Sequence, residues 1–100
     1  MKPELLAYCK KYLAYFPRYY LHLLPDYQDE VNRMFVELLR KKSAEAGSRS
    51  AYKEVCDLIE KYAKACGNEN ALNLIRELKL THVKRPAFID ELGKLNIGTR

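Results

Sequence analysis

Few thiol and imidazole side chains are available for catalysis or zinc binding: Cys9, Cys56, Cys66, His22 and His82. A nucleophile needs a base within hydrogen-bond reach, and the base needs a third group to orient it. A structural zinc site needs about four Cys or His ligands, usually in close pairs such as CxxC. No such pair occurs in the sequence. We therefore expect no catalytic residue and no bound metal, and we interpret the cysteines as reduced thiols in the core.

Two pairs of carboxylates, Asp29 with Glu30 and Asp90 with Glu91, are adjacent in the sequence. Neighbouring residues of a helix do not face a shared site, so these pairs are better explained as partners of a helix N-terminus. The glycine-rich motifs GxxxxGK[ST] and GxGxxG are missing as well, so no cofactor is expected. The sequence predicts a protein that is not an enzyme.

Tyrosines and basic residues offer a different chemistry, that of binding. Eighteen Lys and Arg against thirteen Asp and Glu give a net charge of +5, which favours approach to a polyanion. Most of the eight tyrosines fall on predicted inner helix faces: Tyr8, Tyr12, Tyr27, Tyr52 and Tyr62. We expect those to pack in the core, and we expect an exposed aromatic patch at Tyr15, Tyr19 and Tyr20 in the stretch YFPRYY.

Candidate contacts with a protein partner or a nucleic acid combine these two residue types. They are Arg40, Lys41, Lys42, Arg76, Lys79, Lys84 and Arg85, together with Tyr19 and Tyr20. Lys84 and Arg85 precede a predicted terminal helix. The sequence leaves open whether these two are solvated loop charges or a partner contact.

Helices are predicted wherever apolar residues recur at spacings of three and four. Pro17 and Pro86 stand where the first turn of a helix tolerates proline, so each should open a helix. Asp26, then Ser48 or Ser50, then Asn68 or Asn70 are the expected caps of three long helices. The predicted helices span residues 3–16, 17–24, 26–46, 50–66, 69–80 and 86–95.

These helices and the composition indicate one all-α domain over residues 1–100, or an excised C-terminal module of a longer protein. Hydrophobic residues make up 48% of the chain and charged residues 31%, as in a folded globular domain. Short connections imply antiparallel hairpins, five to six helices in all, arranged as a bundle or as a short right-handed array of the tetratricopeptide or HEAT kind.

The chain shows no membrane span and no secretory signal. No window approaches the roughly 18 consecutive apolar residues that a transmembrane helix needs. The first residues, MKPELLAYCKKYL, place charges within any candidate signal-peptide core. We expect a cytoplasmic protein that does not bind membranes.

Residues 48–95 resemble the C-terminal end of bacterial SWIM zinc finger proteins, and residues 15–52 resemble the helical array that precedes that end. The matched positions are Arg49, Tyr52, Cys56, Gly67, Arg85, Pro86, Asp90 and Leu92. The CxC…CxH motif of the finger is missing, so the resemblance supplies no metal ligand. It implies a separate helical module that offers a surface to another domain or protein.

The leading prediction is therefore a non-enzymatic helical domain for protein interaction or scaffolding. The alternative is a basic helical domain that binds nucleic acid directly, and self-association through an exposed apolar stripe is a further way to use such a domain.

Chelation tests the predicted lack of a metal. Thermal melts with and without EDTA should have the same midpoint, because a structural zinc site would contribute folding energy that the chelator removes. A large fall of the midpoint in EDTA would show that the cysteines and histidines bind a metal after all.

Overall fold

The computed structural model describes residues 2–24 and 26–95, and within them the chain is helical without a strand, which confirms the predicted all-α class. The elements are α1 (Lys2–Lys11), the 3-10 helix η1 (Leu13–Tyr15), α2 (Phe16–Leu23), α3 (Gln28–Glu45), α4 (Arg49–Cys66), α5 (Asn68–Thr81) and α6 (Pro86–Gly93).

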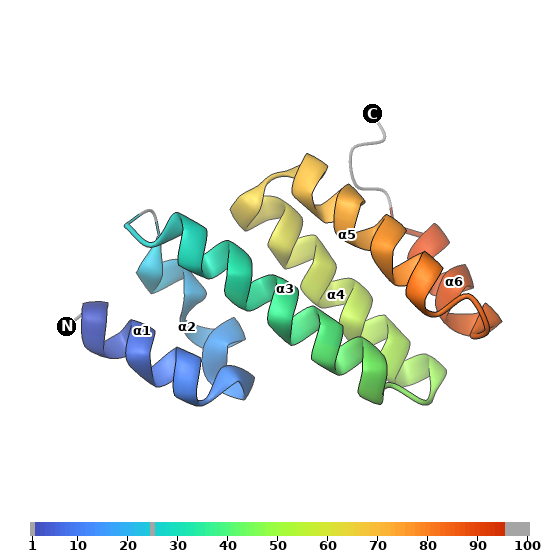
Figure 1. The fold of residues 1–100 in the computed structure, drawn as a ribbon, viewed down its shortest axis with the longest axis horizontal. Coiled ribbons are helices and arrows are strands. Elements are labelled where there is room, and N and C mark those ends of the chain that lie inside the picture. The colour runs from blue at the N-terminus through green and yellow to red at the C-terminus, as the bar shows by residue number, and fades with distance from the viewer. Residues whose placement is uncertain (1, 25, 96–100) are drawn as a thin grey trace.

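The helices pack on one another in nearly the order of the chain (Figure 1). The α1 and α2 helices form a hairpin that lies on α3, α3 packs along α4, and α4 contacts both α5 and α6. The domain measures 43 × 30 × 19 Å, and its shortest dimension corresponds to about two helix diameters. The helices thus pack in two layers, as the helices of a bundle or a short array do.

Phe35 of α3 links the first hairpin to the rest of the core. Its ring centroid lies 4.9 Å from that of Phe16, 5.0 Å from that of Tyr20 and 5.3 Å from that of Tyr62. Phe16 and Phe35 are fully buried, and buried side chains from all six α-helices belong to the same cluster. Aromatic pairs of this kind add stabilisation beyond the area that they bury.

The predicted helix over residues 3–16 is interrupted. The α1 helix ends at Lys11, Tyr12 has φ −122° and ψ 74°, and η1 leads directly into α2. A continuous helix would set the ring of Pro17 against the carbonyl of Leu13, where proline also lacks the amide hydrogen that the helix needs. The break places Pro17 in the first turn of α2 instead, as predicted.

The ends of α3, α4 and α5 confirm some predicted caps and correct others. Ser48 Oγ accepts a hydrogen bond from the Ala51 amide, so Ser48 caps α4. Tyr27, and not Asp26, occupies the position before α3. Gly67 has φ 101° and precedes α5 directly, and Asn70 Nδ2 donates to the carbonyl of Cys66 at the end of α4. Asn70 thus closes the preceding helix.

The environment of Arg85 decides an alternative that the sequence left open. This residue is not a solvated loop charge, because its guanidinium donates to the main-chain carbonyls of Ser43 (2.8 Å), Ala46 (3.0 Å) and Ala44 (3.4 Å). The last carbonyls of a helix have no hydrogen-bond partner within the helix. A cation at this end is also attracted by the negative end of the helix dipole. Arg85 therefore ties the α5–α6 connection to the end of α3. Lys84 is exposed.

Ion pairs attach α6 to the start of α4. Arg49 Nη1 donates to Glu91 at 2.7 Å and to Asp90 at 3.0 Å, and Lys94 lies 3.4 Å from Glu91. The predicted role of Asp90 and Glu91 as partners of a helix N-terminus is therefore wrong. Glu91 is only 5% exposed, and the hydrogen bond from Arg49 holds its pKa below the ordinary value.

Replacing Arg85 and Lys84 one at a time tests the anchor on α3. Arg85→Ala should lower the free energy of unfolding by about 1–3 kcal/mol, because it leaves several carbonyls without a charged donor. Lys84→Ala is the matched control and should change it by less than about 0.5 kcal/mol, as exposed substitutions usually do. Urea unfolding measures both. Equal effects of the two variants would mean that Arg85 contributes nothing beyond its charge.

Acid should weaken the contact between α4 and α6. The folded-state pKa values of Glu91 and Asp90 lie below their ordinary values, so their contribution to stability is present at neutral pH and is lost as the pH falls through the carboxylate range. Glu91→Gln should therefore lose less stability than the parent between about pH 7 and about pH 3 in urea titrations. Glu60→Gln, at an exposed site on α4, should follow the parent. Parallel curves for all three proteins would argue against the ion pair.

Candidate interaction surface

Four tyrosines of the first hairpin form one exposed cluster, the tyrosine face: Tyr8, Tyr12, Tyr15 and Tyr19. The ring centroid of Tyr8 lies 5.1 Å from that of Tyr12, 5.8 Å from that of Tyr15 and 6.3 Å from that of Tyr19. The rings of Tyr12 and Tyr15 are also in contact, at 6.3 Å. Three of the side chains are more than two-fifths exposed, at 42% for Tyr8, 44% for Tyr12 and 42% for Tyr15.

Helical spacing on both sides of the break at Tyr12 assembles this face. Tyr8 lies four residues before Tyr12, and Tyr15 lies four residues before Tyr19, so each pair shares one side of its turn. The opposite sides are buried, because Cys9 of α1 and Phe16 of α2 are fully inaccessible. The hairpin brings the two outward-facing pairs together.

The sequence predicted only part of this cluster. Tyr15 is exposed at the expected patch, whereas Tyr19 and Tyr20 are both half-buried, and Tyr20 packs its ring against Phe16 and Phe35. Tyr8 and Tyr12 were expected in the core, and that expectation is wrong. The stripe of apolar and aromatic residues on α1 is wider than the side of α1 that the neighbouring helices bury. Matching four-residue spacings of tyrosine on either side of a helix break were the signal that could have revealed the face.

The hairpin that carries the tyrosine face is basic. Lys11 Nζ lies 5.4 Å from the ring centroid of Tyr12, which is a cation–π distance, and Lys10 and Arg18 are exposed on the same hairpin. Partial desolvation, with smaller contributions from the neighbouring phenols, raises the pKa of Tyr8 above its ordinary value. The phenol of Tyr8 is therefore a neutral hydrogen-bond donor at physiological pH.

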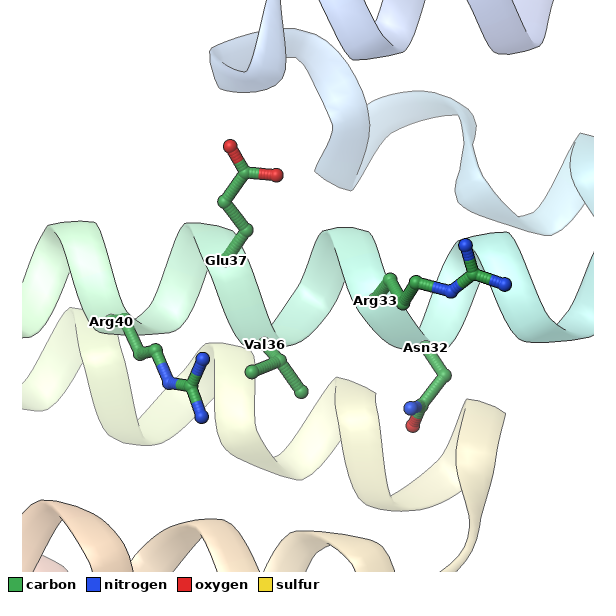
Figure 2. Close-up of a pocket in the computed structure, with 5 residues that line it drawn as sticks. All are labelled: Asn32, Arg33, Val36, Glu37 and Arg40. Carbon is green, nitrogen blue, oxygen red and sulfur yellow. The ribbon is translucent and has the colours of Figure 1, made fainter.

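Arg40, a predicted contact residue, is engaged within the fold. Its guanidinium binds Glu77 of α5 through two hydrogen bonds, at 2.7 and 2.8 Å, and this pairing raises the pKa of Arg40 and lowers that of Glu77. Arg40 also lines a surface depression of about 490 Å³ on α3. Figure 2 shows Asn32 and Arg40 directed toward α4 in that depression, and Asn32 Oδ1 accepts from Tyr62 (2.7 Å).

The other predicted basic residues do not gather beside Arg40. Lys41 and Lys42 line a smaller depression with Leu13 of η1, whereas Arg40 pairs with α5. Arg76 donates to Asn73 on its own helix, Lys79 is half-buried and Lys84 is exposed. With Arg85 bound to the end of α3, the structure divides the predicted contacts among several faces.

The surroundings of the three cysteines disfavour their thiolate forms. Burial raises the pKa of Cys56 and of Cys66 to about 11, and it also raises the pKa of Cys9, so all three are protonated thiols at neutral pH. No group of three or more His, Cys, Asp or Glu residues within 2–24 and 26–95 is arranged to hold a metal ion. None of the helices described is long and apolar enough to cross a membrane.

Comparison of the chain with family models, with curated proteins and with solved structures gives no match. The resemblance to the C-terminal module of SWIM zinc finger proteins accordingly stays a prediction, and the function must be argued from the tyrosine face and its surroundings.

Proposed function

We propose that this chain is a non-enzymatic helical interaction module and that its tyrosine face binds another protein. The observation that carries the proposal is the exposure of Tyr8, Tyr12 and Tyr15, each above 40%, within one cluster of touching rings. A cluster of this kind leaves aromatic area in contact with water that a partner would cover.

The energetics of interfaces support this reading. Tyrosine is enriched at the centres of protein interfaces, where truncating a single ring often weakens binding by more than 1 kcal/mol. The four rings support one another, so they lose little conformational freedom when a partner arrives. Phe35 anchors the hairpin below them through Phe16 and Tyr20, which makes the tyrosine face part of a rigid element.

Two alternative functions have less support. Direct binding of nucleic acid through the predicted basic residues has less support, because Arg40 binds Glu77 and Arg85 binds carbonyls at the end of α3. An enzyme would need an activated nucleophile or base, and the thiols of the described residues have raised pKa values.

We further infer that the module acts in the cytoplasm as part of a larger assembly. The three cysteines are free, as is typical of a reducing compartment. Packing of hairpins in chain order supports a relation to tetratricopeptide or HEAT-like arrays and to the SWIM-associated module, both of which present surfaces to partners.

A selection from a phage-displayed library of random peptides tests the proposed function. The whole chain is the bait, and recovered peptides are then measured against a Tyr8→Ala/Tyr12→Ala/Tyr15→Ala variant. Binding should fall by about tenfold or more, since each ring of an interface centre commonly contributes more than 1 kcal/mol.

Leu80→Ala with Val83→Ala provides the matched control. These residues are 79% and 69% exposed near the turn between α5 and α6, so the control also removes exposed apolar area, and it should bind as the parent does. Circular dichroism and urea midpoints establish that each variant is folded. Tyr12→Ala alone serves if the triple variant unfolds. Peptides that bind every variant equally, or no recovered peptide at all, would refute the proposal.

A further inference from the structure

We propose that the partner of the tyrosine face is an acidic protein segment, in which carboxylates flank an aliphatic or proline side chain. This inference rests on the proposed function and adds the chemistry of the partner. The apolar side chain would lie against the exposed rings. The carboxylates would pair with Lys11, which lies over the ring of Tyr12, and with Lys10 and Arg18, which are exposed on the same hairpin.

The charge of the hairpin is the first argument. Residues 1–24 contain four basic residues, Lys2, Lys10, Lys11 and Arg18, against the single acidic residue Glu4. Less than a quarter of the chain thus holds three of its five net positive charges. Complementary charge accelerates encounter and excludes partners of the same sign, so a surface of this kind selects an acidic partner.

The distribution of charge elsewhere strengthens this contrast. Further along the chain, Arg40 is paired with Glu77, and Arg49 is paired with Asp90 and Glu91. Arg85 donates hydrogen bonds to carbonyls at the end of α3. Lys10 and Arg18 are exposed on the first hairpin instead, and Lys11 lies over the ring of Tyr12. Three arginines of the remaining fold thus stabilise it, whereas Lys10, Lys11 and Arg18 are exposed to solvent.

The arrangement of the rings favours a protein over a single-stranded nucleic acid. Bases bind such surfaces by stacking on free aromatic faces. The ring of Tyr8 is stacked on that of Tyr15 with an interplanar angle of 23°, and Lys11 covers one face of Tyr12. One face of each of these three rings is thus occupied within the hairpin. The remaining ring surfaces and the phenol groups are left for a partner. They suit aliphatic side chains, and phenols donate hydrogen bonds to carboxylate and carbonyl oxygens.

The peptide selection on the intact chain also tests the acidic partner. The measurements are the amino-acid composition of the recovered peptides and their binding to charge variants of the chain. Recovered peptides that depend on the tyrosine face should contain Asp and Glu at about twice the library frequency or more. Their binding should weaken about tenfold or more in a Lys10→Glu/Lys11→Glu/Arg18→Glu variant, and should weaken with added salt.

A second triple variant controls for total charge. Lys53→Glu/Lys64→Glu/Arg76→Glu changes the net charge by the same amount at exposed sites on α4 and α5, so it should weaken binding by about threefold or less if the contacts are local. Equal losses in the two variants would show that only the overall charge matters, and would overturn the inference.

The remaining outcomes separate this inference from the proposed function. Peptides that need the tyrosines but carry no excess of Asp and Glu would overturn the acidic partner and leave the protein-binding function standing. Tyrosine-dependent binding of a single-stranded oligothymidylate, without any recovered peptide, would overturn both. Sedimentation that shows a dimer lost in the tyrosine variant would identify a second copy of the chain as the occupant, and would also overturn the acidic partner.

Discussion

Burial of Phe35 between α2 and α4 is the contact on which the rest of the structure depends. Its ring meets Phe16 and Tyr20 on one side and Tyr62 on the other, so the first hairpin and the central helix share one aromatic contact. A helix cannot bury all of its sides against one neighbour. Once the side of α2 that carries Phe16 is turned inward, Tyr15 is turned toward solvent. The packing of this hairpin on α3 therefore decides both which of its side chains are buried and which are exposed.

The opposite end of the domain is held by charge. Arg85 satisfies carbonyls at the end of α3, and Arg49 neutralises the buried carboxylate of Glu91 on α6. Removing Arg85 would take a charged donor from these carbonyls, and removing Arg49 would leave Glu91 with Lys94 alone, so either change costs more than such contacts contribute when complete. This use of cations inside the fold explains why net charge is a poor guide to a binding site here. A basic residue is available for binding a partner only if it is not already paired with a carbonyl or carboxylate of the fold.

Tyrosine serves two purposes in this chain, and the surroundings decide which. Tyr62 is buried, lies tilted against Phe35 and donates a hydrogen bond from its hydroxyl to Asn32, while Tyr52 stacks on Phe88 at 4.9 Å. These rings fill the core. The rings of the tyrosine face have the same chemistry but contact one another, with Lys11 at their edge. In a scaffold of this kind, stability is concentrated along α3 and α4, whereas the proposed recognition surface lies on a peripheral hairpin.

The sequence by itself determined the helices from α3 to α6 and the proline-started α2, because apolar spacing, the Ser48 cap and the position of Pro86 act over one or two turns. It did not determine which side of α1 is covered, and so Tyr8 was misplaced. Nor could it pair Arg40 with Glu77, which lie 37 residues apart. Periodicity describes the sides of a single helix, whereas exposure and ion pairing depend on which neighbour lies against each side. Only the packing of the hairpins on α3 and α4 decided that, and with it which tyrosine rings and which cations are exposed.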